Sequence, residues 1–237
     1  MSVQSIIIKI FRGRLQLLAT LSKKRAGNEA FRIFCTPYFR MAYKESEVKG
    51  SERLSFKFGS ANTIGYRWNR GDRKKLLIVH GFRSASANFL HFTAPLIQKG
   101  YEIVAFDAPA HGLSEGKRLN AIEYKDFITA LHDHYGPFGA FLAHSFGGLA
   151  VSMNLAELSE NTNIKTVLVA PAANSRQLIE FFLKKCVSGM RRYVTTFTPI
   201  FIASAVKILN GSPLQGVLML SMVLFSGYTI QVILLLL

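Results

Sequence analysis

Hydrophobic and polar residues alternate along two neighbouring stretches, LSFKF at 54–58 and TIGYRW at 63–68. Alternation with a period of two places the apolar side chains of each stretch on one face, as in a half-buried β-strand. The stretch between them, GSAN at 59–62, has the composition of a turn. The pattern therefore predicts an antiparallel hairpin over residues 54–68.

After the hairpin, the alternation gives way to short runs that are continuously apolar. These runs are LLIVH (76–80), EIVAF (102–106), AFLA (140–143) and TVLVA (166–170). Such runs are typical of parallel strands that helices cover on both faces.

Two segments between these runs have a helical period instead. Their apolar stripes are Tyr124, Phe127, Ile128 and Leu131 in 121–134, and Leu149, Met153 and Ala156 in 147–159. Alternation of buried strand and helix predicts the α/β class, with a doubly wound, mostly parallel sheet.

The N-terminal segment, residues 4–34, has the pattern of a basic amphipathic helix pair. The apolar positions near helical spacing are Ile7, Ile10, Phe11, Leu15 and Leu18. One interpretation is a helix packed on the globular body, and the other is a helix lying on a membrane surface. The first is favoured because the body that follows needs covering.

The composition and net charge of the chain indicate how many domains it can form and which kinds of partner it could bind. With 237 residues, of which 49% are apolar, the chain can bury one domain core. The formal net charge is +15, which suggests an anionic surface such as nucleic acid or lipid headgroups. Because no basic–aromatic module accompanies this charge, nucleic acid is not expected as a partner.

The two cysteines, Cys35 and Cys186, are isolated in the sequence. We therefore expect neither a disulfide framework nor a metal site. This cysteine content is typical of a reducing, cytoplasmic setting.

Three strand ends carry residues suited to chemistry, in VHGFRSAS (79–86), FDAPAHGLS (106–114) and AHSFGG (143–148). In open α/β sheets, sites gather at the carboxyl ends of the strands. A serine on a tight strand-to-helix turn needs small neighbours, and Ala143 and Gly147 meet that need around Ser145. Its helix directs N–H groups towards charge that develops there, so the amides of Phe82 and Phe146 would form a two-donor oxyanion hole.

These three motifs, in this order and spacing, resemble the α/β-hydrolase superfamily. They are most similar to bacterial hydrolases that keep DxPxHGxS after strand four and AHSxGG at the nucleophile elbow, and the likeness covers residues 54–173. Ala143 is a departure, since the superfamily usually has Gly there.

The resemblance implies that Ser145 is the nucleophile, that the Phe82 and Phe146 amides form the oxyanion hole, and that Asp107 and His111 shape loops. It also implies hydrolysis of a small ester-like substrate through an acyl-enzyme, no metal or organic cofactor, and a cytoplasmic protein.

The base that should activate Ser145 is missing from the chain. In this fold the acid and then the histidine follow the serine. Beyond Ser145 there is no histidine and no aspartate, and the acids are Glu157, Glu160 and Glu180. His144 does not replace the base, since neighbouring strand residues point to opposite faces. We therefore expect negligible esterase activity, and the alternative is a catalytically dead, membrane-anchored, hydrolase-like binding protein.

The C-terminal tail has an unusual composition, because residues 208–237 contain no charged side chain. Residues 214–237 would span about 36 Å as a helix, enough to cross a bilayer and anchor the protein. The other interpretation is translation out of frame, which the simultaneous loss of acid and histidine favours. Either way we expect the sheet to be truncated after about strand six, leaving residues 166–170 as an exposed edge.

The chain accordingly divides into four parts by pattern. They are a basic helical segment at 1–50, an α/β-hydrolase core at 51–175, a lid-like helical segment at 176–207 and the apolar tail at 208–237.

Overall fold

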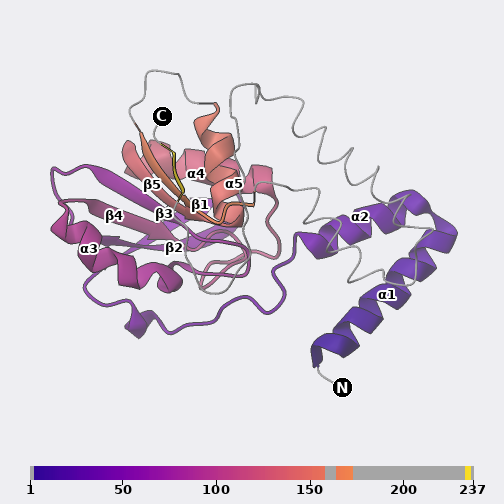
Figure 1. Cartoon of the computed structure of the whole chain (residues 1–237). Helices are drawn as coiled ribbons and strands as arrows, with labels where there is room; N and C mark the ends of the chain where they lie inside the picture. Colours follow the sequence, from indigo (N-terminus) through magenta and orange to yellow (C-terminus); the bar gives the residue numbers. More distant parts are fainter. Residues whose placement is uncertain (1–2, 158–163, 173–232, 236–237) are drawn as a thin grey trace. The chain divides into compact units, whose positions relative to one another are not determined.

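The computed structural model describes residues 3–157, 164–172 and 233–235 (Figure 1). These residues fall into two compact units. The first unit ends at Thr36 and contains two helices, and the second begins at Pro37 and contains the sheet. In the described part of the chain the boundary between the two units lies at 36/37, and residues 37–50 group with the sheet.

The first unit contains the predicted helix pair, α1 (Val3–Leu21) and α2 (Lys23–Phe34). Ser22 separates them, and its hydroxyl accepts a hydrogen bond from the backbone N–H of Arg25, which caps α2. The predicted apolar stripe is correct at Leu15, which is buried, and wrong at Ile10, which is 59% exposed. These two residues are about 140° apart around the helix, so a face centred on Leu15 excludes Ile10.

The described part of the second unit forms one seven-stranded sheet in the order β1-β2-β4-β3-β5-β6-β7. Its strands are β1 (Glu52–Phe58), β2 (Ala61–Trp68), β3 (Lys75–Val79), β4 (Glu102–Phe106), β5 (Phe138–His144), β6 (Lys165–Val169) and β7 (Ile233–Leu235). Strands β4, β3, β5 and β6 are parallel, and β1, β2 and β7 pair antiparallel at the two sides. The predicted α/β class and mostly parallel sheet are confirmed.

The predicted hairpin is also confirmed, with a shorter turn. β1 and β2 pair from Glu52↔Arg67 to Phe58↔Ala61, so only Gly59 and Ser60 remain in the turn. Gly59 has φ +58°, a left-handed conformation that glycine adopts without steric cost.

Helices cover both faces of the sheet. The connections contain α3 (Thr93–Gln98), α4 (Ala121–Tyr135) and α5 (Phe146–Leu155), together with 3₁₀ helices at Glu45–Glu47 and Ser86–Phe92. Alternate residues of β3 serve the two faces: Leu77 and Val79 join the core under α4 and α5, whereas Leu76 and Ile78 join the core with the 3₁₀ helix Ser86–Phe92 and α3.

The apolar stripe predicted for α4 is confirmed, whereas the one predicted for α5 is largely wrong. All four stripe residues of α4 are buried, as predicted. On α5, Met153 is buried, but Leu149 and Ala156 are only half-buried, and the fully buried side chains are Ala150 and Val151. The stripe was wrong because α5 is enclosed on several sides, and a helix buried in this way has no single apolar face.

Strand β6 does not have the exposed edge that we expected. Its residues Thr166, Val167 and Leu168 pair with Leu235, Leu234 and Ile233 of β7. An apolar edge strand offers unpaired N–H and C=O groups, and the apolar tail supplies a partner for them. Residues 214–237 are therefore not one continuous helix, since three of them are strand.

Across the described residues, no helix has both the length and the apolar character needed to cross a bilayer. The predicted lid-like segment, 176–207, and most of the tail lie outside the described residues.

We expect Leu77→Ala to lower the free energy of unfolding by about 2–5 kcal/mol. Leu77 is 1% exposed in the central strand β3, so the change leaves a cavity under α4 and α5. Leu113→Ala is the matched control, because Leu113 is 36% exposed, and it should cost about 1 kcal/mol or less. The midpoint of denaturant unfolding measures both. Equal losses for the two variants would contradict this description of the core.

Candidate active site

Ser145 occupies a sharp turn between β5 and α5. Its φ is +50° and its ψ is −117°, a strained backbone for a residue with a side chain. The backbone fixes it on both sides: its N–H donates to the carbonyl of Val169, and its carbonyl accepts from the N–H groups of Leu149 and Ala172. The turn therefore holds Ser145 at the carboxyl end of the parallel strands, where sites of this class of sheet form.

Two glycines allow the chain to pass close to this turn. A Cβ atom on Gly147 would collide with the backbone carbonyl oxygens of Val79 and His80. A Cβ atom on Gly81 would lie 2.9 Å from Nδ1 of His144 and 3.2 Å from Cβ of Ser145. The loop after β3 thus lies directly against Ser145, and only residues without a side chain fit at these two positions.

The three predicted site residues lie together at this point. Phe146 follows Ser145 and begins α5, and the Phe82 and Phe146 rings pack edge to face with centroids 5.6 Å apart. No described acceptor takes the backbone N–H of Phe82 or Phe146. The first N–H groups of a helix have no partner within it, and they carry the positive end of its dipole. This arrangement can stabilise negative charge next to Ser145.

The Asp107 carboxylate ties the loops around the site together. It is fully buried, and each of its oxygens accepts two hydrogen bonds. Oδ1 accepts from the N–H and the hydroxyl of Ser86, both at 2.7 Å, and Oδ2 accepts from the Tyr43 hydroxyl at 2.7 Å and the Leu113 N–H at 2.8 Å. A Cβ atom on Gly112 would collide with this carboxylate. Asp107 thus connects the chain segments after β3 and β4 with residues that precede β1.

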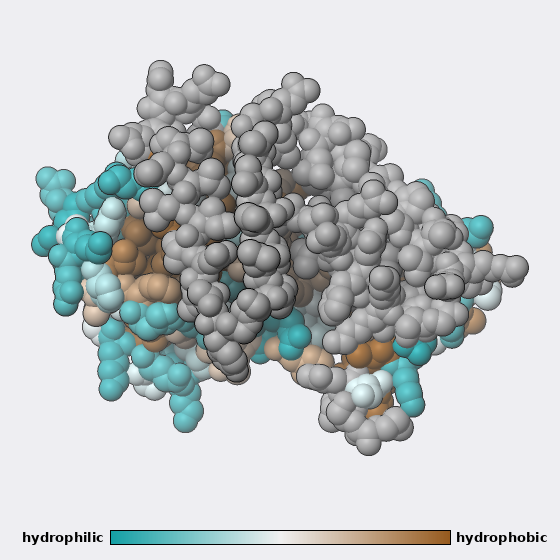
Figure 2. Space-filling view, in the orientation of Figure 1, coloured by the Kyte–Doolittle hydropathy of each residue, from teal (hydrophilic) through white to brown (hydrophobic). Residues whose placement is uncertain are grey.

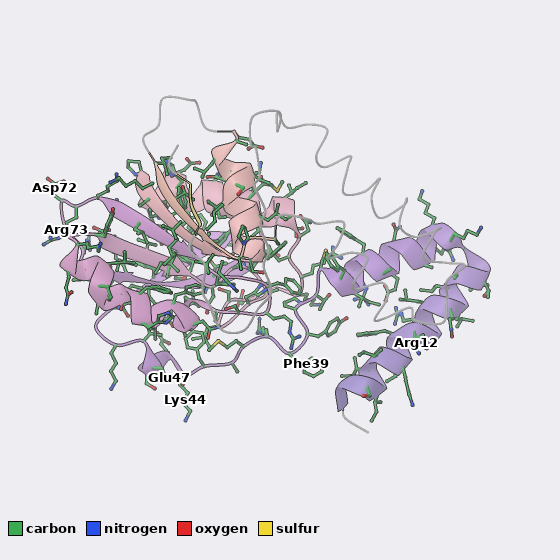
Figure 3. All side chains as sticks on the ribbon, in the orientation of Figure 1. Arg12, Phe39, Lys44, Glu47, Asp72 and Arg73 are labelled. Atoms are coloured by element: carbon green, nitrogen blue, oxygen red, sulfur yellow. The ribbon has the colours of Figure 1, made fainter. Side chains whose placement is uncertain are left out.

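Residues 37–44 form a segment that sequence reasoning missed. Besides the bond from Tyr43 to Asp107, the N–H of Met41 donates to the carbonyl of Arg83 at 2.9 Å. The Arg83 guanidinium lies over the ring of Phe39, which is labelled in Figure 3, 5.9 Å from its centroid. Burial, with the Asp107 charge, raises the pKa of Tyr43, so its hydroxyl stays a donor. This segment therefore braces the loop that carries Phe82.

His80 has no ring nitrogen available for catalysis. Its Nδ1 lies 2.8 Å from the carbonyl of Gly81, and its Nε2 accepts the N–H of Ala108 at 2.9 Å. An imidazole that accepts at Nε2 and donates at Nδ1 is neutral. Burial lowers the pKa of His80 to about 4, in agreement with this form.

His111 is buried beside His80, with ring centroids 5.2 Å apart. Its Nδ1 lies 2.9 Å from the carbonyl of Pro109, and its Nε2 has no hydrogen-bond partner among the described atoms. The Phe82 ring lies edge-on to it at 5.4 Å. Burial lowers the pKa of His111 to about 3. Both histidines are thus neutral parts of a buried ring cluster.

Neither His144 nor Glu157 makes a described hydrogen bond to the Ser145 hydroxyl. The His144 ring lies 6.1 Å from that of Phe89, which belongs to the core on the α3 side, whereas Phe146 packs against the opposite core. Glu157 lies beyond the end of α5, where it pairs with Lys125 at 2.8 Å. Glu160 and Glu180 lie outside the described residues.

We expect Gly147→Ala to destabilise the fold by about 1–3 kcal/mol, because the new methyl group overlaps backbone that cannot move without breaking β3. Gly13→Ala is the control, since a Cβ atom there meets nothing within 4 Å and alanine favours a helix interior. Thermal unfolding of both variants measures the difference. A Gly147→Ala protein as stable as the parent would refute the close approach of β3 and α5.

We also expect the stability to fall as the pH drops from about 6.5 towards about 4. The folded chain keeps His80 and His111 neutral in this range, whereas the unfolded chain protonates them below about pH 6.5. The unfolded state therefore binds more protons there, and His80 alone would contribute up to about 3 kcal/mol of stability that acid removes.

Melting temperatures measured from neutral pH to about pH 4.5 test this contribution. His111→Asn should flatten the dependence on pH, because the asparagine amide nitrogen takes the place of Nδ1, keeps a donor for Pro109 and does not titrate. His91→Gln, at an exposed histidine, should leave the slope unchanged. The same slope in all three proteins would contradict the assignment to the buried histidines.

Known proteins give several matches to this chain. A family model described as "Serine aminopeptidase, S33" matches residues 71–213, more than half of the chain. A dihydrolipoyllysine-residue acetyltransferase component of the acetoin cleaving system of Pseudomonas putida is 33% identical over 120 residues, which is 49% of this chain and 32% of that protein. The chain therefore spans about a third of the length of this curated relative.

Solved structures with a similar chain path include a predicted CIB-like hydrolase from Thermoplasma acidophilum, with 18% identity and a TM-score of 0.46 over 57% of this chain and 69% of that one. Epoxide Hydrolase A from Mycobacterium thermoresistibile has 20% identity and a TM-score of 0.45 over 55% of this chain and 44% of that one. With the family match over residues 71–213 and the sheet order described above, this chain belongs to the α/β hydrolases, in the serine aminopeptidase S33 family.

Proposed function

We propose that this chain carries the nucleophile side of a serine hydrolase site for small ester-like substrates. The observation that carries the proposal is the backbone of Ser145, with its positive φ at the junction of β5 and α5. Strain of this kind persists only where the surrounding structure enforces it, and here Gly147 and two neighbouring backbone segments do so. A serine hydroxyl presented in this way suits attack on a carbonyl carbon.

The chemistry is acyl transfer in two steps. Oγ of Ser145 bonds to the carbonyl carbon, and the Phe82 and Phe146 N–H groups stabilise the oxygen that becomes negative. The alcohol leaves with a proton, and water then attacks the acyl-serine to release the acid and restore the hydroxyl. No metal or organic cofactor enters these steps.

In this scheme the proton of Ser145 ends on the leaving alcohol, but none of the chain's described residues supplies the base that would transfer it. Both nitrogens of His80 are engaged, and the chain has no histidine after His144. Loss of triad members lowers the rate by about four to six orders of magnitude. We therefore propose that the 237-residue chain turns over esters negligibly, with the oxyanion donors in place and the base absent.

The missing base also favours a second candidate, a hydrolase-like binding protein that holds a ligand at the same donors without turnover. In our sequence-based hypothesis this protein is anchored through residues 214–237. Because Ile233–Leu235 pair with β6, such an anchor would have to end before residue 233.

Hydrolysis of a nitrophenyl ester, with and without added imidazole, tests the proposed hydrolase site. Without imidazole, the parent and Ser145→Ala should hydrolyse the ester at rates within about twofold of each other, because no base activates the serine. Imidazole supplies a diffusible base, so it should accelerate the parent beyond Ser145→Ala, which corrects for hydrolysis by imidazole itself.

The outcomes separate the two parts of the proposal. Turnover by the parent alone that Ser145→Ala abolishes would show that a base is present, and His111→Gln and His144→Gln would then identify it. Equal rates for parent and Ser145→Ala at every imidazole concentration would overturn the assignment of Ser145 as nucleophile. Ser152→Ala, at a buried serine on α5 whose hydroxyl bonds the carbonyl of Gly148, is the control for a serine outside the turn.

A further inference from the structure

The outer face of α1 carries an apolar stripe that is exposed. Its members are Ile6, Ile10, Leu17 and Leu21, which are 44%, 59%, 65% and 70% exposed. Their spacing of four, seven and four residues places them within about 60° around the helix, along a length of about 22 Å. Exposed apolar side chains that align in this way mark an interaction surface more often than scattered ones do.

This stripe is distinct from the face by which α1 packs. Leu15 and Ala19 are 1% and 7% exposed and lie on the other side of the helix. A helix that only covers a core has polar residues opposite its buried face. α1 has a second apolar face instead, so the packing of its buried face, which holds Leu15 and Ala19, does not explain the stripe.

The helix pair is strongly cationic around this stripe. Residues 1–36 contain seven Lys and Arg side chains and one acid, Glu29. Glu29 is neutralised by ion pairs with Arg14 at 2.9 Å and Arg32 at 2.7 Å. Lys23, Lys24 and Arg25 follow Leu21 within four positions, and all three are exposed. Figure 2 shows apolar and hydrophilic surface side by side near the N-terminal end of α1 as Figure 1 draws it.

We propose that the outer face of α1 docks on an anionic phospholipid membrane and lies in the plane of its surface. Ile6, Ile10, Leu17 and Leu21 would enter the boundary between headgroups and acyl chains, and the Lys23–Arg25 cluster would contact lipid phosphates. An apolar stripe beside cations is the combination that binds such interfaces, and each cation near the surface strengthens binding about fivefold.

The charge also argues against two other occupants. A second copy of this face would bring two cationic clusters together, which disfavours a dimer. Nucleic acid would pair with the lysines but leave the four apolar side chains without a partner, since its affinity comes from phosphate contacts. A lipid surface satisfies both features.

Co-sedimentation of the full chain with vesicles tests the proposal. Vesicles of phosphatidylcholine with about 30% phosphatidylserine should bind the protein, whereas pure phosphatidylcholine vesicles should bind it at least about tenfold more weakly. Leu17→Gln/Leu21→Gln should reduce binding to the anionic vesicles roughly tenfold, since glutamine keeps helix propensity and removes apolar area. Leu113→Gln, at an exposed leucine of the sheet unit, should bind like the parent.

A second pair of variants separates the local cluster from the overall charge of +15. Lys23→Glu/Lys24→Glu and Lys117→Glu/Arg118→Glu change the net charge equally, and all four residues are exposed. Only the first pair should lower binding by about tenfold or more. Leu17→Trp adds a direct readout: its fluorescence should shift to the blue on anionic vesicles, while Trp68 is buried and stays constant.

Three results would overturn the proposal. One is no preference for anionic vesicles, and another is equal weakening by the two charge-reversal pairs. The third is binding that survives Leu17→Gln/Leu21→Gln, which would place the contact elsewhere, for example in the apolar tail. If these leucine changes instead abolish self-association in light scattering and leave vesicle binding intact, the stripe is a dimer interface. Far-ultraviolet circular dichroism confirms that each variant keeps its helices.

Discussion

The loops at the carboxyl end of the sheet depend on the burial of one carboxylate, that of Asp107. A buried charge is tolerated only when hydrogen bonds replace the water it loses. Four donors do so here, from Ser86, Tyr43 and Leu113. The donors come from three different segments, so satisfying the charge fixes the start of a 3₁₀ helix, the segment before β1 and the turn that carries His111. The loop that presents Phe82 is placed by the same bonds.

The loops that carry the proposed oxyanion donors are therefore held in place by hydrogen bonds before any substrate binds. Gly81 and Gly147 have no side chains to hold β3, β5 and α5 apart, so these elements approach closely. Ser145, at the turn between β5 and α5, has a strained backbone with a positive φ. Preorganised donors stabilise developing charge without the cost of reorientation. The described groups that would do this in our proposal lie between Gly81 and Ala172, whereas the base and acid of this fold come from later in the chain. In the proposed function, one half of the site forms without the other.

Sequence patterns predicted the parts of this structure that depend on local order. The strands, the hairpin and α4 follow from periodicity, and the Ser145 turn follows from small residues at fixed offsets. The Tyr43–Asp107 bond could not be predicted in this way, because 64 positions separate its partners and nothing in their spacing marks the pair. The stripe of α5 was wrong because tertiary contacts enclose that helix. The pairing of β7 was missed because an apolar run suits a strand as well as a membrane span.

Whether a base accepts the hydroxyl proton of Ser145 determines whether the proposed site hydrolyses a ligand or only binds it. His80 cannot accept this proton, because the carbonyl of Gly81 and the N–H of Ala108 already bind its two ring nitrogens. If His111 accepted it, a charged imidazolium would lie in a buried cluster of rings, where burial disfavours the charged form and lowers the pKa. The Phe82 and Phe146 N–H groups need no base to act. Donors that stabilise a tetrahedral oxyanion also bind a carboxylate, which is the product of ester hydrolysis. Under the proposed function, a site with these donors and no base would therefore bind acyl ligands without hydrolysing them.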